Sequence, residues 1–193
     1  QAEKKGVRGI ILENRIEKKL LPKKIPLLQI PNLGENLNSI LDYFYSKPMQ
    51  NMYIIGVTGT DGKTSTCHHL AQFLSSLYPK KIIGVITSEG NGIYPNLIKT
   101  NFTTPDNHIL YNEYKKFYKK NVNILIIECS SQGLDQGRLN YHSFNTSILT
   151  NIYKDHIDYH KSISQYIESK LKLFEMTKDF ILLNSQSKKI KNK

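Results

Sequence analysis

A short apolar run, a glycine-rich turn and an amphipathic stretch follow one another between residues 53 and 77. The run Tyr53–Thr58 predicts a buried strand, and the stretch Lys63–Leu77 predicts a helix. The turn that joins them contains the sequence Gly59-Thr-Asp-Gly-Lys-Thr-Ser65. A strand that leads through glycines into a helix is typical of folds in which helices cover a parallel sheet. The turn also places backbone N–H groups and a helix N-terminus at one point, which favours a bound anion.

The residues of this turn predict a phosphate-binding loop. Lys63 can reach the terminal phosphates of a nucleotide, and Thr64 can offer its hydroxyl to Mg²⁺. The spacing is shorter than in the common phosphate-loop pattern, which requires a glycine at position 57, where this chain has Val57. An ordinary glycine turn between a strand and a helix is the alternative, and the Lys-Thr pair at the helix start disfavours it. Nucleotide binding is therefore the leading hypothesis.

Apolar runs and amphipathic stretches continue to alternate as far as residue 184. We therefore predict an α/β fold with a mostly parallel sheet flanked by helices. In such sheets ligands bind at the carboxyl ends of the strands, where the glycine turn, Glu128 and residues 151–156 are expected to project. The predicted strands are 53–58, 82–87, 124–129, 146–151 and 180–184, and the predicted helices are 63–77, 106–120 and 162–177.

Residues 1–47 are predicted to contain two strands, at 7–13 and 25–30, and a helix at 36–45. They are too few for an independent core, so we expect them to be the end of a preceding domain. Residues 48–193 are then an incomplete nucleotide-binding domain, and 46–51 link the two. The chain begins with Gln1 and ends in a lysine-rich tail, and we expect it to be a piece of a longer protein.

The formal charge of +11 raises the question of nucleic-acid binding. The lysines are scattered, however, and no basic stripe with interleaved aromatic residues occurs, so we expect a solvated cationic surface and no nucleic-acid partner. No run approaches the roughly 20 apolar residues that span a bilayer, which argues against membrane insertion. The two cysteines, Cys67 and Cys129, have no metal or disulfide spacing, and a soluble protein of a reducing compartment fits best.

Candidate metal ligands follow two of the predicted strands. Glu128 ends an apolar strand, where a carboxylate commonly holds Mg²⁺, and a solvated strand-end Glu is the alternative. The segment Asp155–His160 brings four metal-capable side chains into six residues, and His156 and Asp158 are favoured because they follow a strand on the same edge as the glycine turn. Lys170 lies on the next helix, and its pattern alone does not select it, because helix lysines are mostly solvated.

Two loops carry candidate ligands for an acidic substrate. Residues Ser130–Arg138 include one of only three arginines, and a guanidinium suits a carboxylate or phosphate in a forked geometry. Thr103–Asp106 supplies hydroxyls before a helix, with Asp106 in the N-cap position. A capping loop and a substrate contact explain this second loop equally well.

Taken together, these residues resemble the Mur ligases, ATP-dependent amide-forming enzymes of peptidoglycan synthesis. The Gly-Thr-x-Gly-Lys-Thr loop at 59–64 is shared by that family and by folylpolyglutamate synthases. The resemblance extends from Gly6 to about Asn184, and it implies that 1–47 end a UDP-binding domain and that 48–193 belong to the central ATP-binding domain. Three further segments resemble the E-type branch, which adds the third amino acid to UDP-N-acetylmuramoyl-L-alanyl-D-glutamate: Thr103–Pro105, Glu128–Arg138 and Thr150–Lys170.

The resemblance implies a role for each matching residue. Lys170 matches the lysine that reacts with CO₂ in this family, and its carbamate would be an oxygen ligand for a metal. Two Mg²⁺ ions are implied, with Thr64, Glu128, His156 and carbamylated Lys170 as their ligands. ATP would contact Gly59, Thr60, Asp61, Gly62, Lys63, Thr64, Ser65 and Asn151. The UDP-muramoyl-dipeptide would contact Thr103, Thr104, Ser130, Gln136 and Arg138. The implied catalytic residues are Lys63, Glu128, His156 and Lys170.

The implied reaction is ATP-dependent amide formation in the bacterial cytoplasm, which serves cell-wall synthesis, cell shape and cell division. The substrate carboxylate attacks the γ-phosphate to give an acyl phosphate, and the amine of a diamino acid, meso-diaminopimelate or L-lysine, then displaces phosphate. The family has a third domain that holds this amino acid. This stretch offers no counterpart to it, so we expect weak nucleotide binding and no turnover by this stretch alone.

Departures from the family pattern and alternative functions stand beside this hypothesis. Asp61 replaces the more common Asn of the loop, Gln132 the usual His, and Lys161 the usual Gly. The alternatives are another Mur or folylpolyglutamate-type ligase, a truncated or degenerate relic that binds only nucleotide or a partner protein, and a nucleic-acid-binding module. The residues do not indicate an oligomeric state.

Overall fold

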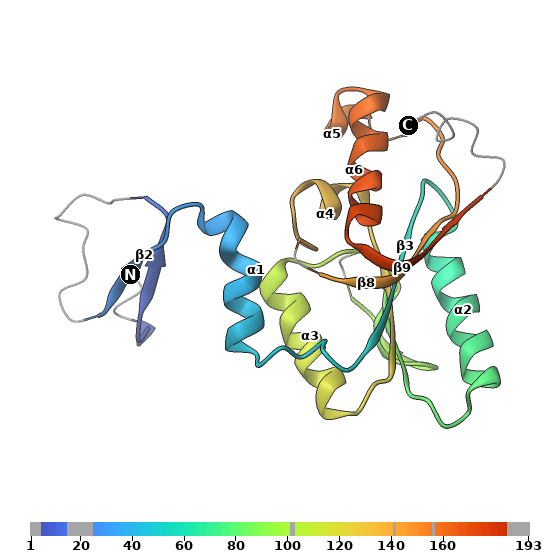
Figure 1. The fold of residues 1–193 in the computed structure, drawn as a ribbon, viewed down its shortest axis with the longest axis horizontal. Helices are drawn as coiled ribbons and strands as arrows, with labels where there is room; N and C mark the ends of the chain where they lie inside the picture. Colours follow the sequence, from blue (N-terminus) through green and yellow to red (C-terminus); the bar gives the residue numbers. More distant parts are fainter. Residues whose placement is uncertain (1–4, 15–24, 101–102, 141, 156, 185–193) are drawn as a thin grey trace.

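The computed structural model describes residues 5–14, 25–100, 103–140, 142–155 and 157–184. Its main body is a seven-stranded sheet with the strand order β6-β5-β4-β7-β3-β8-β9 (Figure 1). Within this sheet the pairs β4·β5 and β5·β6 are antiparallel, and all other pairs are parallel. This arrangement confirms the predicted α/β class. The strands are β3 (Tyr53–Thr58), β4 (Ile83–Ile86), β5 (Asn91–Ile93), β6 (Asn96–Ile98), β7 (Ile124–Glu128), β8 (Phe144–Leu149) and β9 (Thr177–Leu183).

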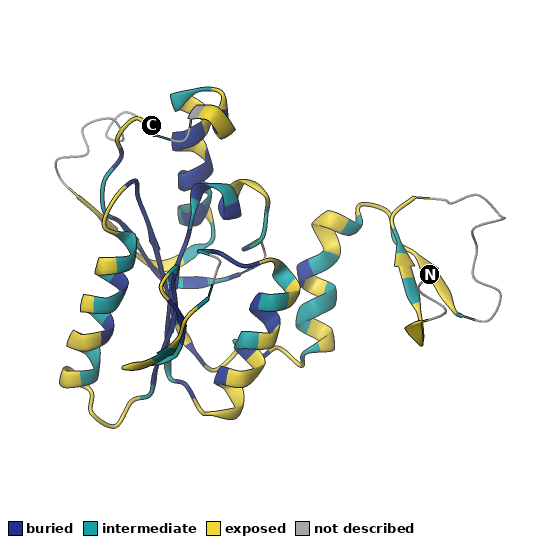
Figure 2. Ribbon diagram, turned by 180° about the vertical axis from the view of Figure 1, so that it is seen from behind, coloured by how far each residue is buried: buried dark blue, intermediate teal, exposed yellow. Residues whose placement is uncertain are grey.

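Helices cover both faces of this sheet (Figure 1). α2 (Lys63–Leu77) packs on one face, and α3 (Asn107–Lys119) and α6 (Ile163–Glu175) pack on the other. Neighbouring residues of β3 point to opposite faces, because Ile54 belongs to the cluster on the α3 side and Ile55 to the cluster on the α2 side. Burial on both faces explains why this strand is a continuous apolar run (Figure 2). The packing of the core therefore holds β3 in place, and the glycine loop starts directly after the last residue of this strand.

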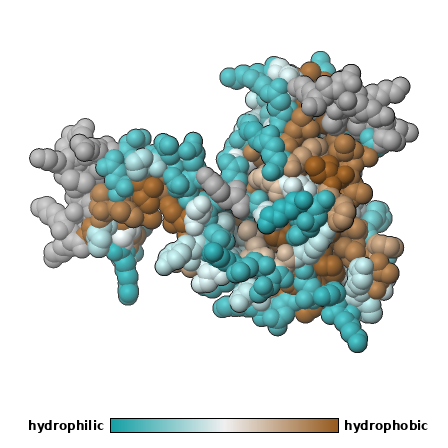
Figure 3. Space-filling model, viewed as in Figure 1, coloured by the Kyte–Doolittle hydropathy of each residue, from teal (hydrophilic) through white to brown (hydrophobic). Residues whose placement is uncertain are grey.

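The N-terminal residues form a small separate unit. β1 (Ile10–Leu12) and β2 (Leu27–Gln29) pair in parallel and stand away from the main body in Figure 1. α1 (Leu33–Phe44) connects this pair to the main body and packs beside α3. Apolar side chains of β1 and β2 are exposed, as they also are along β9 (Figure 3). The domain division after residue 47 stays a prediction.

The differences from the predicted elements concern their ends and the shortest elements. The hairpin of β5 and β6 is missing from the prediction because Gly, Asn and Pro interrupt its apolar residues. α4 (Ser131–Asp135) and α5 (Ile157–His160) are also missing, because so few residues show no period. β8 begins and ends two residues earlier than predicted, since Phe144 is fully buried and the chain leaves the sheet after Leu149.

Candidate functional site

The glycine loop lies at the carboxyl end of β3 and is held by the residues that follow β8. The backbone N–H of Thr60 donates to the carbonyl of Asn151 at 3.0 Å, and that of Asp61 donates to its side-chain Oδ1 at 2.9 Å. Thr150 Oγ1 and Asn151 Nδ2 donate to the carbonyl of Asp61 at 2.7 and 3.1 Å. Asn151, which the resemblance assigns to ATP, thus uses both ends of its amide to shape the loop.

Two glycines of the loop adopt backbone conformations that other residues avoid. Gly59 has a φ of 149°, and a Cβ there would lie 1.9 Å from Oγ1 of Thr150. Gly62 has a φ of 73° at the N-cap of α2, and no atom lies within 4 Å of the position its Cβ would take. Gly59 is therefore required by both conformation and close approach, and Gly62 by conformation alone.

Three oxygen-bearing side chains meet beside the start of α2. Glu128 is buried at the end of β7, and its Oε2 accepts hydrogen bonds from Thr64 Oγ1 at 2.9 Å, Ser88 N at 3.0 Å and Ser88 Oγ at 3.2 Å. Hydroxyl and carboxylate oxygens are the ligands that Mg²⁺ prefers, so this donor set fits that ion. Ser88 is not among the residues predicted from the sequence, although its place directly after a predicted strand, on the same side of the sheet as the glycine loop, is a usable signal.

Lys170 is buried on α6, with 1% of its surface exposed, and points at the glycine loop. Its Nζ donates to the carbonyl of Gly59 at 2.6 Å and lies 4.5 Å from the ring centroid of Tyr166. Burial, and next the nearby charge of Lys63, lower the pKa of Lys170 from 10.5 to about 7. Tyr166 also ties α6 to the loop, because its hydroxyl lies 2.9 Å from Oγ1 of Thr60. A lysine that is neutral in part near pH 7 is able to react as an amine.

Lys63 itself bends back over the loop, since its Nζ donates to the carbonyl of Thr60 at 2.8 Å. His156 lies outside the described residues, so its metal role stays a prediction. In the described part of the chain, no three His, Cys, Asp or Glu side chains form a metal-binding group. Lys161, which stands where the Mur ligases usually have Gly, has a φ of 61°, a conformation that glycine adopts at little cost.

Two of the predicted substrate residues connect the loops after β7 and before α3. Thr104 is buried, and its Oγ1 donates to the carbonyl of Glu128 at 3.0 Å and accepts from the backbone N–H of Ser130 at 3.0 Å. Ser130 caps α4, because its Oγ accepts from the N–H of Gly133 at 3.1 Å. These hydroxyls therefore hold the loops together, and Thr103 beside them is half-buried.

Gln136 and Arg138 lie next to this pair of loops. Arg138 Nη1 donates to the carbonyl of Thr104 at 2.6 Å, and Arg138 Nε donates to Gln136 Oε1 at 2.9 Å. The same Nε lies 3.3 Å from Oδ1 of Asp106, whose side chain makes no capping hydrogen bond to α3. The structure thus brings Thr104, Ser130, Gln136 and Arg138 into one network beside Glu128.

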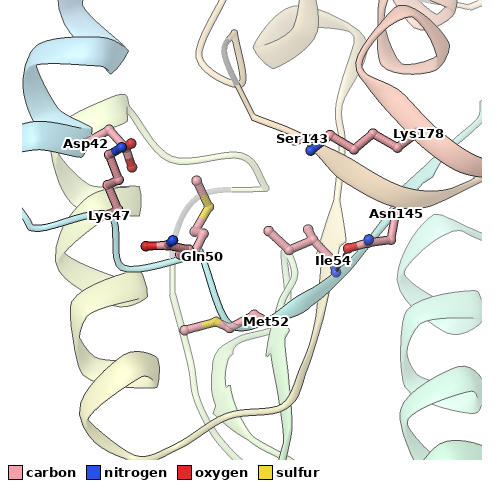
Figure 4. A pocket seen from close by; sticks show the side chains of 9 residues that line it. Asp42, Lys47, Gln50, Met52, Ile54, Ser143, Asn145 and Lys178 are labelled. Atoms are coloured by element: carbon pink, nitrogen blue, oxygen red, sulfur yellow. Dashed lines mark hydrogen bonds between the residues drawn. The ribbon is translucent and has the colours of Figure 1, made fainter.

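A separate hollow lies at the amino ends of β3 and β8, opposite the glycine loop, where the chain passes from α1 into β3 (Figure 4). Its volume is about 340 Å³, and it contains none of the predicted site residues. Within it Asn145 is already engaged, since its Oδ1 accepts from the N–H of Ile54 at 2.9 Å. The hollow is lined by Asp42, Lys47, Met49, Gln50, Met52, Ile54, Ser143, Asn145 and Lys178.

The family model of the Mur ligase middle domain matches residues 57–193, which contain the glycine loop, Glu128 and Lys170. The chain belongs to the Mur ligase family. None of the helices in its described residues is both long and apolar enough to cross a membrane.

Curated relatives of this Mur ligase chain include two proteins named UDP-N-acetylmuramoyl-L-alanyl-D-glutamate--2,6-diaminopimelate ligase. The one from Chromobacterium violaceum is 40% identical over 150 residues, which are 77% of this chain and 30% of that protein. The one from Pseudomonas aeruginosa is 34% identical over 170 residues, which are 88% of this chain and 34% of that protein. The chain therefore spans about a third of the length of these relatives.

Two solved structures of ligases are also similar to this chain. A structure of UDP-N-acetylmuramoyl-L-alanyl-D-glutamate--2,6-diaminopimelate ligase has a TM-score of 0.74 and 29% identity over 92% of this chain and 35% of its own. A MurF ligase from Thermotoga maritima in complex with ADP has a TM-score of 0.57 at 16% identity, over 100% of this chain and 40% of its own. The second likeness concerns the fold alone.

Proposed function

We propose that this chain carries the ATP-binding part of an E-type Mur ligase, which joins a diamino acid to UDP-N-acetylmuramoyl-L-alanyl-D-glutamate in peptidoglycan synthesis. The observation that carries the proposal is the meeting of three groups at the glycine loop. Oγ1 of Thr64 lies 2.9 Å from Oε2 of Glu128 at the start of α2, and Nζ of Lys170 donates to the carbonyl of Gly59. A phosphate loop, a metal-binding carboxylate and a buried amine are the groups that phosphoryl transfer to a carboxylate uses. The names of the curated relatives support the same reaction and favour 2,6-diaminopimelate.

ATP would bind along the glycine loop, with its phosphates over the N-terminus of α2. The helix N-terminus and the backbone N–H groups of Gly62–Ser65 attract the phosphate charge. Lys63, released from the carbonyl of Thr60, would move onto the transferred phosphoryl group. Gly59, Thr60 and Asp61 would form the wall of the phosphate site, in the shape that Asn151 imposes.

Thr64, Ser88 and Glu128 would hold one Mg²⁺ through their oxygens. Such an ion neutralises phosphate charge and aligns the reacting groups. A second Mg²⁺ would be held with the help of His156 and of carbamylated Lys170.

Lys170 is chemically suited to become a carbamate by reaction with CO₂. Only a neutral amine attacks CO₂, and the lowered pKa supplies that form near neutral pH. The carbamate nitrogen keeps one hydrogen, so the hydrogen bond to Gly59 can persist after the reaction. Lys63, which lowers the pKa of Lys170 by its charge, would stabilise the new negative charge in the same way.

Arg138 and Gln136 would bind the acidic peptide end of the muramoyl substrate beside Glu128, in the loops that Thr103, Thr104 and Ser130 shape. The substrate carboxylate attacks the γ-phosphate, the β–γ phosphoanhydride bond breaks, and ADP leaves with its electrons, so that an acyl phosphate is formed. The amine of the diamino acid then forms the amide bond, and phosphate leaves with the electrons of the broken acyl–oxygen bond. These steps require positioning and charge neutralisation rather than a protein nucleophile. We place this reaction in the bacterial cytoplasm, where it would support cell shape and division.

Calorimetric binding to the 193-residue chain tests the proposal. A non-hydrolysable ATP analogue with Mg²⁺ should bind, and K63M should weaken it at least about tenfold. UDP-N-acetylmuramoyl-L-alanyl-D-glutamate should bind more weakly to R138Q than to the unchanged chain, whereas dihydropteroate should not bind. Preference for the pteroate would favour a folylpolyglutamate-type ligase, and nucleotide binding without either acid would favour a nucleotide-binding relic.

A further inference from the structure

The most buried residue of α1 is polar. Asn38 is 1% exposed, whereas the other residues of this helix are half-buried or exposed. A buried amide is costly unless its donors and acceptor are used. Asn38 therefore occupies a position that an apolar residue would fill at less risk, and its contacts indicate what it holds.

All polar atoms of the Asn38 side chain have partners. Its Nδ2 donates to the carbonyl of Asn140 at 2.6 Å and to that of Gly137 at 3.3 Å. Its Oδ1 accepts from Nδ2 of Asn107, which begins α3. Its own carbonyl accepts from the hydroxyl of Tyr111 at 3.0 Å. The two backbone carbonyls set the orientation of the amide, because a flipped amide would turn its oxygen toward both of them.

The two carbonyls that Asn38 holds stand at the two ends of one turn. Gly137 and Asn140 are joined by the N–H of Asn140, which donates to the carbonyl of Gly137 at 3.1 Å. Between them, Leu139 is fully buried and Arg138 projects to the carbonyl of Thr104 and to Gln136. The turn that aims Arg138 is thus clamped from a helix 99 residues away in sequence.

We propose that Asn38 is the positioning residue for Arg138. Its amide fixes the turn, and the turn fixes the direction in which the guanidinium leaves the main body. Asn38 lies in the N-terminal segment, so the clamp makes the placement of Arg138 depend on the docking of α1 against α3. The consequence for the muramoyl substrate rests on the function proposed above, whereas the link from Asn38 to Arg138 does not.

The arginine side chains provide a direct readout of this link. The chain has three arginines, so its arginine Nε–H spectrum in ¹⁵N NMR is simple, and the signal missing in R138Q identifies Arg138. Because Nε of Arg138 donates to Gln136 at 2.9 Å, its hydrogen should exchange slowly with water. In N38L, which keeps the side-chain size and removes the clamp, this exchange should accelerate at least about tenfold, the value of one hydrogen bond.

N36L is the matched control, since Asn36 lies on the exposed side of the same helix and bonds only to carbonyls at its start. N36L should leave the Arg138 signal unchanged. A lower melting temperature for N38L with an unchanged Arg138 signal would overturn the proposal, because a purely structural role predicts that result. An unprotected Arg138 signal in the unchanged chain would overturn it as well.

A second variant covers the case in which N38L does not fold. N107A removes the side-chain donor to Oδ1 of Asn38 and should accelerate the exchange of Arg138 Nε–H by a smaller factor; no change would contradict the clamp. Binding of UDP-N-acetylmuramoyl-L-alanyl-D-glutamate then separates the two proposals. If the unchanged chain does not bind it, the proposed function fails while the NMR result stands. If it binds, N38L combined with R138Q should bind no more weakly than R138Q alone, and an additive loss would show that Asn38 does not act through Arg138.

Discussion

The side-chain nitrogen of Lys170 lies 2.6 Å from the carbonyl oxygen of Gly59. This hydrogen bond joins α6 to the glycine loop across 111 residues of sequence. Because burial and the charge of Lys63 lower the pKa of Lys170 to about 7, its charge changes within the physiological range. The stability and the reactivity of the site should therefore both depend on pH.

Replacing Lys170 by Met should increase the free energy of unfolding more at pH 6 than at pH 9. The folded-state pKa of about 7 lies below the ordinary 10.5, so the unfolded chain binds the proton more tightly and the unchanged protein gains stability as pH rises between these values. Met carries no charge and lacks this dependence. Urea unfolding at the two pH values measures the difference between K170M and the unchanged chain. K172M is the control: Lys172 lies on the same helix, is half-buried and pairs with Asp135 at 3.0 Å. An equal stability difference between K170M and the unchanged chain at both pH values would contradict the prediction.

Lys170 should form a carbamate when the protein is equilibrated with ¹³C-bicarbonate. The extent should increase from pH 6 to pH 8, because the neutral fraction of an amine with a pKa of about 7 increases over this range. A ¹³C NMR signal in the carbamate region measures it. The signal should be absent in K170M and present in K172M, and its persistence in K170M would assign it to another amine.

Replacing Glu128 by Gln should reduce the effect of Mg²⁺ on nucleotide binding. Glu128 supplies the carboxylate oxygen that meets Thr64 and Ser88, and an amide oxygen keeps those hydrogen bonds but lacks the charge. We expect the enhancement of ATP-analogue affinity by Mg²⁺ to fall at least about tenfold, with little change in affinity without the ion. Glu89→Gln is the control, because Glu89 is exposed in the loop next to Ser88. Equal Mg²⁺ enhancement in the two variants would exclude Glu128 as a ligand.

Replacing Gly59 by Ala should destabilise the fold more than replacing Gly62 by Ala. At Gly62 the cost is conformational, about 1 kcal/mol. At Gly59 a Cβ would also lie 1.9 Å from Oγ1 of Thr150, so we expect about 2–4 kcal/mol in total. The free energies of unfolding from urea titration test the order, and equal losses would mean that Thr150 does not hold the loop.

His142 should make the protein sensitive to acid. It is buried, its Nε2 lies 2.9 Å from the hydroxyl of Tyr114, and burial lowers its pKa from 6.5 to about 4. The unfolded chain therefore takes up the proton first, and up to about 3 kcal/mol of stability is lost as pH falls through this range. H142Q should flatten this loss, whereas replacement of the exposed His108 by Gln should not. Parallel pH profiles for the two variants would contradict the assignment.

Much of the fold could be predicted from local sequence signals. The run Tyr53–Thr58 and the stretch Lys63–Leu77 have the structures and the bounds that their patterns predict. These signals are strong because β3 is buried on both faces and α2 starts at a glycine. The hairpin of β5 and β6 carries no such signal, since its pairing depends on β4 rather than on its own composition.

The candidate site was less predictable than the fold because its contacts are long-range. Nothing in the neighbourhood of Lys170 distinguishes it from a solvated helix lysine, and only the tertiary packing of α6 buries it. The structure shows the amide of Asn151 on the backbone of Asp61, and its contact with the nucleotide stays a prediction. The predicted roles of the nucleotide-binding, metal-binding, catalytic and substrate residues remain predictions.

The partners of the glycine loop also determine when this site can exist during synthesis. The motif is complete once residue 65 has been made, but Thr150, Asn151, Tyr166 and Lys170, which hold its backbone and its side chains, come about a hundred residues later. A nascent chain that ends before Thr150 would contain every residue of the motif and still lack these supports. Nucleotide affinity should therefore appear late in synthesis, because it requires the folded sheet and not only the residues of the motif.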